Sequence, residues 1–136
     1  MKIPNISCDI QIFSSVNPSE DPEKVKKAIS NIFPNSSIVT ENSSAHSQSH
    51  DLRSLEKIYE TIHSRQSQKI YRRTLEKNLK NDTTWFYLNK QAAFVEKIAI
   101  CEESDESPLG PIKIILTSSN IDGIIDWMVS GSSNFS

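Results

Sequence analysis

The sequence contains little glycine and no long apolar run, and both absences restrict what the protein can be. Its three glycines, Gly110, Gly123 and Gly131, are isolated from one another. This excludes a glycine-rich phosphate loop of the usual nucleotide-binding kinds. No stretch approaches the roughly 20 apolar residues that span a bilayer, and no apolar signal segment follows Met1. We therefore expect a cytoplasmic protein with no membrane partner.

Cysteine is also scarce, since Cys8 and Cys101 are the only two and lie too far apart for a zinc motif. Each lies in an alternating apolar segment, where a small buried thiol is favoured, although a disulfide between them stays open. His46 and His50 lie in a serine-rich loop with no evident third metal ligand. The acids of residues 102–106 have the composition of a solvated loop, and no nucleophile is spaced from a base. We expect no metal, no cofactor and no enzymatic activity.

What the sequence does contain is the composition of a soluble globular protein, with 36% hydrophobic and 24% charged residues in 136. This length predicts one domain, which we place at residues 1–130, with a flexible tail at residues 131–136. The net charge is −2, but residues 51–80 hold eight basic and four acidic residues. That local charge of +4 leaves −6 elsewhere, and such asymmetry favours a polyanionic partner.

Hydrophobic periodicity predicts the first half of the fold. Residues 6–12 alternate as a half-buried strand, and a helix follows, capped by Asp21 and stopped by Pro34. A short strand is expected at residues 37–41, and then a polar loop at 42–50 with too little apolar surface to pack. Asp51 is a candidate cap for the next helix, which we expect to break at residues 63–68 before a second helix begins.

The second half is richer in strand signals. Residues 85–95 are the most strand-prone stretch, as two strands meeting at a polar connection or as one long bent strand. The strand character continues to Cys101, and the proline, glycine and proline of residues 107–111 predict a rigid turn. A strand at residues 112–117 and a last helix from about Asn120 complete the element order β-α-β-α-α-β-β-β-α.

The helix after residue 68 separates apolar from basic residues. Ile70, Tyr71, Leu75 and Leu79 fall on one half of the helical wheel. The other half is basic, and with the flanking cations it comprises Arg65, Lys69, Arg72, Arg73, Lys77 and Lys80. This stripe is interpreted either as a surface that follows RNA phosphates or as an ordinary solvated helix face. The sequence leaves both interpretations open.

The polar break within residues 85–95 consists of Asn89, Lys90 and Gln91. Two amides and an ammonium can donate hydrogen bonds to phosphate, sugar or base edges. The same three residue types are also common in solvated turns that have no function. The sequence leaves both interpretations open.

Several motifs together resemble a family of small archaeal proteins described as RNA-binding. The matching stretches are residues 21–34 (DPEKVKKAI, then NIFP), residues 88–94 (LNKQAAF), residues 107–112 (SPLGPI) and residues 125–127 (IDW). The sequence departs from the family pattern at Tyr71-Arg72-Arg73-Thr74-Leu75, where an Asp-Thr-Ala-Arg run is usual. It departs again after Trp127, which is usually followed by Leu-Ala-Pro.

The resemblance implies an α+β fold: a two-layer sandwich with a mostly antiparallel sheet of four to five strands and helices on one face. It also implies a fold similar to that of the large-subunit ribosomal protein that holds the 5S RNA. Fold analogy supports a function only by association.

Our leading hypothesis is a non-catalytic protein that recognises structured RNA mainly by the backbone and shape of the RNA. The candidate RNA-binding residues are Arg65, Lys69, Arg72, Arg73, Lys77, Asn89, Lys90 and Gln91, with Lys24, Lys26 and Lys27 as weaker candidates. The alternative is a protein-interaction module or homodimer, which an exposed sheet face or free edge strand would favour. An enzyme using Asn89, Lys90 and Gln91 ranks well behind both.

Overall fold

The computed structural model describes residues 1–34 and 36–130, and its centre is a six-stranded sheet. The strands are β1 (Asp9–Ser15), β2 (Val39–Glu41), β3 (Ser44–Ser49), β4 (Thr83–Leu88), β5 (Ile100–Cys101) and β6 (Ile112–Thr117). They lie in the order β2-β3-β1-β6-β4-β5, and every neighbouring pair is antiparallel. The tail predicted at residues 131–136 lies outside the described residues.

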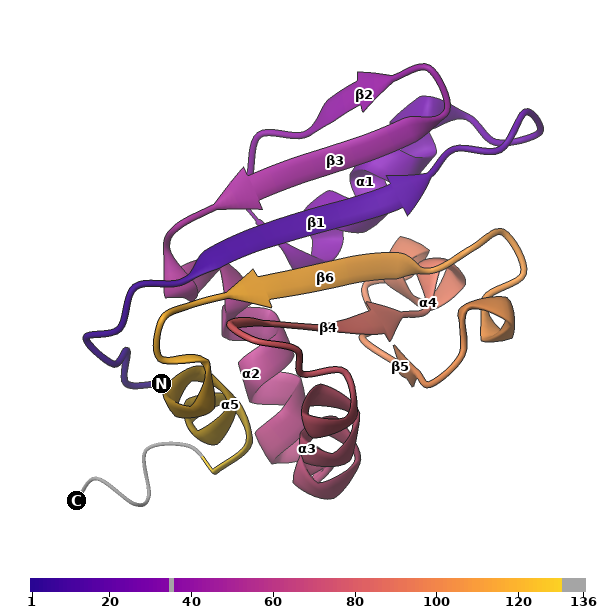
Figure 1. Cartoon of the computed structure of the whole chain (residues 1–136). Coiled ribbons are helices and arrows are strands. Elements are labelled where there is room, and N and C mark those ends of the chain that lie inside the picture. Colours follow the sequence, from indigo (N-terminus) through magenta and orange to yellow (C-terminus); the bar gives the residue numbers. More distant parts are fainter. Residues whose placement is uncertain (35, 131–136) are drawn as a thin grey trace.

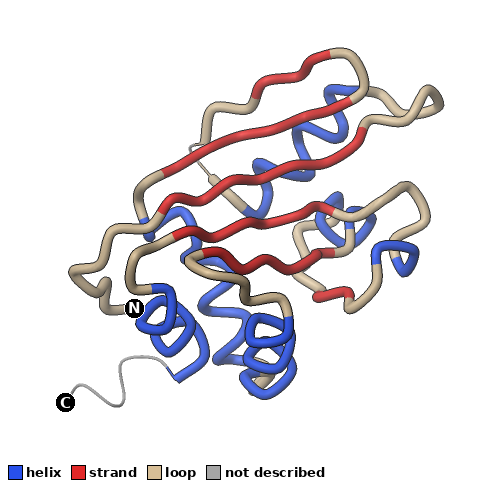
Figure 2. Tube along the Cα trace, in the orientation of Figure 1, coloured by secondary structure: helices blue, strands red, loops and turns tan. Residues whose placement is uncertain are grey.

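Five α-helices occur in the described part of the chain, and they form one layer behind the sheet (Figures 1 and 2). They are α1 (Pro22–Ile32), α2 (Glu56–Ser64), α3 (Gln68–Lys77), α4 (Lys90–Phe94) and α5 (Ile121–Ser130). Short 3-10 turns occupy Leu52–Leu55 and Ser104–Glu106. No helix in residues 1–34 or 36–130 is both long and apolar enough to cross a membrane.

The mixed α/β architecture with an antiparallel sheet is confirmed, but the predicted strand count and element order are wrong. The polar segment predicted as a loop at residues 42–50 contains β3, which pairs with β1 on one side and β2 on the other. Backbone hydrogen bonds to two neighbours hold this strand, so it needs few apolar side chains. Ala45 and Ser47 point into the core, and the Ser47 hydroxyl donates to the carbonyl of Ser37 at 2.7 Å.

The strand-prone stretch at residues 85–95 also differs from its prediction. Its first part forms β4, but the chain after Leu88 turns into α4 instead of a second strand. Asn89 caps this short helix, because its side-chain oxygen accepts a hydrogen bond from the amide of Ala92 at 2.9 Å. A cap of this kind favours helix over continued strand despite the apolar residues that follow.

Local signals elsewhere are confirmed. Asp21 caps α1 by accepting from the amide of Glu23 at 3.0 Å, with Pro22 as the first helical residue. Asp51 accepts from the amide of Arg53 at 2.9 Å and so caps the 3-10 turn Leu52–Leu55 that leads into α2, and not α2 itself. The expected helix break separates α2 from α3, and Gln66 there has a positive φ of 53°.

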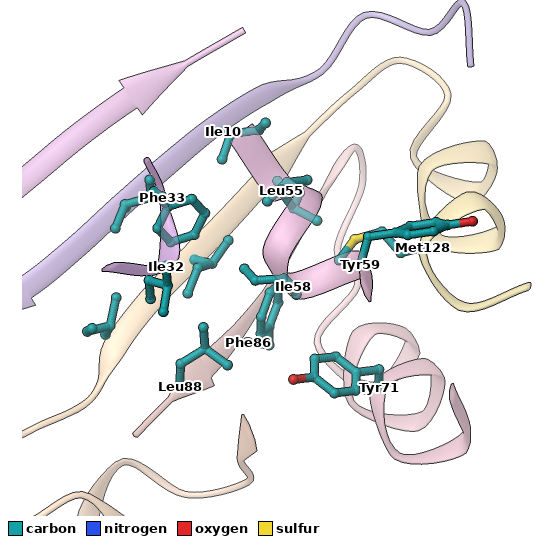
Figure 3. Close-up of a cluster of buried hydrophobic side chains, with 14 of the residues drawn as sticks. Ile10, Ile32, Phe33, Leu55, Ile58, Tyr59, Tyr71, Phe86, Leu88 and Met128 are labelled. Carbon is teal, nitrogen blue, oxygen red and sulfur yellow. The ribbon is translucent and has the colours of Figure 1, made fainter. Parts of the chain in front are cut away.

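The core lies between the sheet and the helix layer (Figure 3). Each long strand alternates a buried with a less buried residue, so one sheet face is packed and the other is not. Tyr71 meets Phe86 edge to face with ring centroids 5.7 Å apart, and Tyr59 stacks on Trp127 at 5.1 Å. Each such aromatic pair contributes about 1 kcal/mol beyond its buried area.

Candidate nucleic-acid interface

Lys90 is fully buried and lies inside the protein instead of on the surface. Its ammonium donates to the backbone carbonyls of Ser15 and Leu109, both at 2.8 Å. It also pairs with the carboxylate of Glu20, at 3.0 Å and 3.2 Å from the two oxygens. A side chain with no exposed surface and every N–H occupied cannot bind RNA, so the structure corrects that expectation for Lys90.

Glu20 is the charged partner that makes this burial stable. Burial alone would raise the pKa of Glu20, but hydrogen bonds from the backbone and side chain of Asn17 and the contact with Lys90 outweigh it. The net effect lowers the pKa of Glu20 below its ordinary value. The Glu20 carboxylate therefore stays ionised near neutral pH. Through Lys90 it ties the loop after β1 to the start of α4 and to the loop before β6.

The other two residues of the polar segment also have structural roles. The oxygen of Asn89 is occupied by the cap of α4, and the side-chain oxygen of Gln91 accepts from the hydroxyl of Ser107 at 3.0 Å. The same hydroxyl lies 2.7 Å from the carbonyl oxygen of Gly110, so its one proton serves either acceptor. The whole segment therefore fastens the loop at residues 107–111 to α4, which differs both from an RNA contact and from the solvated turn that the sequence left open.

The basic stripe on α3 divides into paired and unpaired cations. Arg72 donates to Glu76 at 3.3 Å, to Asp126 on α5 at 3.1 Å and to the hydroxyl of Ser130 at 2.9 Å. Arg73 forms an ion pair with Glu102. Acidic side chains therefore neutralise both arginines. Arg72 fastens α3 to α5, and Arg73 fastens α3 to the loop after β5.

Three cations of the predicted site are free. Arg65, Lys69 and Lys77 are exposed, and none of them forms an ion pair with the residues that the structure describes. Lys69 and Lys77 lie on α3 and Arg65 lies on the turn before it, and α3 belongs to the helix layer (Figure 1). We call Arg65, Lys69 and Lys77 the free α3 cations. They are the part of the predicted RNA site that stays available for phosphate contacts.

The second exposed surface is the sheet face that the helices leave uncovered. Residues paired across antiparallel strands share a face, so the register places side chains in rows. One row runs across five strands as Val39, His46, Phe13, Lys113 and Tyr87. The next row contains Gln48, Gln11, Ile115 and Trp85. We call these two rows the open sheet face.

Aromatic rings and one ammonium dominate the open sheet face. Phe13 is 45% exposed, which is unusual for so large an apolar side chain. The Trp85 and Tyr87 rings lie 4.9 Å apart, and the Lys113 ammonium lies 4.7 Å from the Trp85 ring centroid. Beside Phe13 is a depression of about 490 Å³ that several residues of the two rows line. Lys113 forms no ion pair with any described residue, so its charge faces rings instead of a carboxylate.

The groups with shifted pKa values lie in the packed interior. Burial raises the pKa of Cys8 to about 11 and raises the pKa values of Cys101 and Tyr71. Both cysteines are buried free thiols, and a raised pKa keeps them protonated and unreactive. Among residues 1–34 and 36–130, no cluster of three histidine, cysteine or acidic side chains could hold a metal ion.

Comparison with known proteins assigns this chain to a family. A protein-family model described as "RNA binding" matches residues 9–118. A UPF0201 protein of Methanothermobacter thermautotrophicus is 37% identical over 119 residues, which cover 88% of this chain and 89% of the relative. This chain belongs to the UPF0201 family.

Other UPF0201 members agree with that assignment. One from Sulfurisphaera tokodaii is 38% identical over 117 residues, 83% of this chain and 81% of the relative. The crystal structure of the UPF0201 protein from Methanococcus jannaschii superimposes with a TM-score of 0.76 at 30% identity. That superposition covers 89% of this chain and 98% of the other. The shared fold therefore includes nearly every element described above.

The open sheet face was absent from the sequence-based prediction, although a signal for it exists. Ile10 and Ile12 are buried, so Phe13 has the parity of the outward-facing positions in that strand. Trp85 and Tyr87 likewise alternate with buried Phe86 and Leu88. Large aromatic side chains at outward positions of two strands could have indicated an exposed aromatic surface. Bringing the two strands to either side of β6 required the tertiary structure.

Proposed function

We propose that the protein binds RNA and catalyses no reaction, with phosphates held by the free α3 cations. The observation that carries the proposal is a set of three exposed cations on α3 and the turn before it, none of which is ion-paired with a described residue. They belong to a chain whose family model is described as RNA binding. Such cations contact the backbone of a structured RNA without reading its sequence. Arg72 and Arg73 are not part of the proposed site, because each is already paired with acidic side chains.

The absence of catalysis is supported by where the perturbed groups lie. A general acid or base works best with a pKa near the operating pH. The raised pKa values of Cys8, Cys101 and Tyr71 move away from neutrality. Glu20 is held as an ionised partner of Lys90. All four groups thus have packing or ion-pair roles.

The test is RNA affinity by fluorescence anisotropy over a range of salt concentrations. Each phosphate contact contributes roughly 0.7–0.9 to the slope of log affinity against log salt, so replacing all three free α3 cations by alanine should flatten the slope by about 2–3. The matched control replaces Lys2, Arg53 and Lys97, three exposed cations outside the candidate site, and so removes the same charge. Equal losses in both variants, or no loss in the α3 variant, would contradict the proposed location.

A second candidate function is self-association through the edge of the sheet. All three residues of β2 are exposed, and Val39 is 45% exposed. Among the described strands, β2 pairs only with β3 and forms an edge of the sheet. Unpaired edges accept a further strand, including one from a second copy. Light scattering should then show a mass that rises with concentration, and Val39→Lys should abolish the rise. A constant monomer mass would remove this candidate.

A further inference from the structure

The open sheet face has a composition that the α3 surface lacks. Three aromatic rings lie in its two rows together with amides, an imidazole and one ammonium. Every RNA base has an apolar face that stacks on an aromatic ring, and its edges pair with amide or imidazole groups. Base faces become accessible only where the RNA is single-stranded.

We propose that the open sheet face binds a single-stranded segment of RNA by stacking its bases on Phe13, Tyr87 and Trp85. This inference rests on the proposed function, RNA binding, and adds the class of RNA and the surface. Antiparallel sheets covered by helices on one side present stacking aromatics in the same way in RNA-recognition motifs, where two or three bases stack.

The geometry provides two stacking stations with a cation between them. Phe13 and Tyr87 flank Lys113 on neighbouring strands, which places their backbones about 10 Å apart, or two strand spacings. Trp85 lies against Tyr87 and extends the second station into the next row. The sugar-phosphate backbone of the RNA would cross β6 above Lys113 and join the bases at the two stations.

The position of Lys113 allows its ammonium to leave an aromatic ring for an RNA phosphate. Its ammonium lies over the Trp85 ring at 4.7 Å and has no carboxylate partner among the described residues. A cation–π contact at an exposed site is weak, so a phosphate can draw the ammonium away from the ring. That movement frees the ring for a base and neutralises the phosphate in the same step.

The side chains around the first station can read base edges. His46 is paired with Phe13 across the strands, and Gln11 and Gln48 face each other in the neighbouring row. Gln11 and Gln48 both donate to Asp9, at 3.3 Å and 2.7 Å, which fixes the positions of their amides. The depression beside Phe13 is lined by all three side chains, so a base stacked there has hydrogen-bonding groups at its edge.

The experiment uses the position of the two tryptophans. Trp85 lies on the open sheet face, whereas Trp127 is 1% exposed and packs in the core. Unlabelled single-stranded 12-mer RNA of mixed sequence should quench the emission of the wild-type protein. Trp85→Phe retains only the buried reporter, and its emission should stay constant during the same titration. The same RNA presented as a perfect duplex should not quench either protein.

Affinity measurements on labelled single-stranded 12-mer complete the test. Phe13→Ala and Tyr87→Ala should each weaken binding about 10-fold, and Lys113→Met should flatten the salt slope by about 0.7. The matched control is Val95→Ala, which truncates a 64% exposed apolar residue at the end of α4, in the helix layer. Val95→Ala should bind as the wild type does. Circular dichroism checks that each variant is folded.

The outcomes separate the two proposals. If the RNA binds but Trp85 emission and the affinities of the ring variants do not change, RNA binding stands and the sheet-face site is overturned. If no RNA of either form binds above a charge-matched control protein, both proposals fail. If the ring variants instead convert a dimer to a monomer in light scattering, the open sheet face is a protein interface and the sheet-face site is overturned.

Discussion

Replacing Lys90 with methionine is the most direct test of the structural role found for the polar segment after β4. Methionine retains the length and apolar stem of lysine but removes the ammonium. The carbonyl of Ser15 and the carboxylate of Glu20 then lose their strongest donor. Removing one partner of a buried ion pair costs about 3–5 kcal/mol.

The structure places the expected cost at the low end of that range. The carbonyl of Leu109 still accepts from the side chain of Asn17 at 2.8 Å, and Glu20 keeps two hydrogen bonds from Asn17. We therefore expect Lys90→Met to lower the free energy of unfolding by about 3 kcal/mol. For a chain of this size the midpoint of thermal unfolding should fall by about 10 °C.

Urea unfolding followed by circular dichroism measures this change, with Lys97→Met as the matched control on an exposed lysine. A double-mutant cycle with Glu20→Gln should give a coupling of about 1–3 kcal/mol, because the two side chains form one network. An unfolding free energy within about 0.5 kcal/mol of wild type would refute the reasoning. So would a stable variant that has lost RNA affinity, since Lys90 would then be an RNA contact.

Three further predictions concern single sites. Because the pKa of Glu20 is lower in the folded protein than its ordinary 4.5, its contribution to stability is present above that value and lost as pH falls through the folded pKa. Urea midpoints at about pH 6 and about pH 3 should differ less in Glu20→Gln than in wild type. Gly110→Ala should destabilise by at least about 1–2 kcal/mol in thermal unfolding, because φ is +87° and the added Cβ lies 2.9 Å from the Ser15 hydroxyl; a neutral result would contradict the strained turn. Asn89→Ala should cost about 1 kcal/mol by loss of the α4 cap and leave RNA affinity unchanged.

Much of the candidate site depended on partners that a linear sequence does not reveal. The cations of α3 were identified from the helical wheel, but their availability was not. Arg72 is neutralised by Asp126, which is 54 residues away, and Arg73 by Glu102, which is 29 away. An ion pair across elements depends on helix packing, so charge counted along the chain overestimates the charge that a surface presents.

The sequence by itself determined the features that short-range physics controls. Asp21 and Asp51 were identified as caps because a cap is a contact between residues two or three positions apart. The apolar stripe of α3 and the alternation of β1 followed from periodicity. The break between α2 and α3 followed from a run of polar residues that no buried face could use.

Tertiary structure decided the features whose free energy comes from distant partners. The segment of β3 is polar and becomes a strand because β1 and β2 supply its backbone hydrogen bonds. Lys90 is buried because Glu20, 70 residues away, neutralises it. The rows of the open sheet face exist only once β6 separates β1 from β4. For β3 and for Lys90 the local preference pointed elsewhere, and the gain from pairing or neutralisation across the fold was larger.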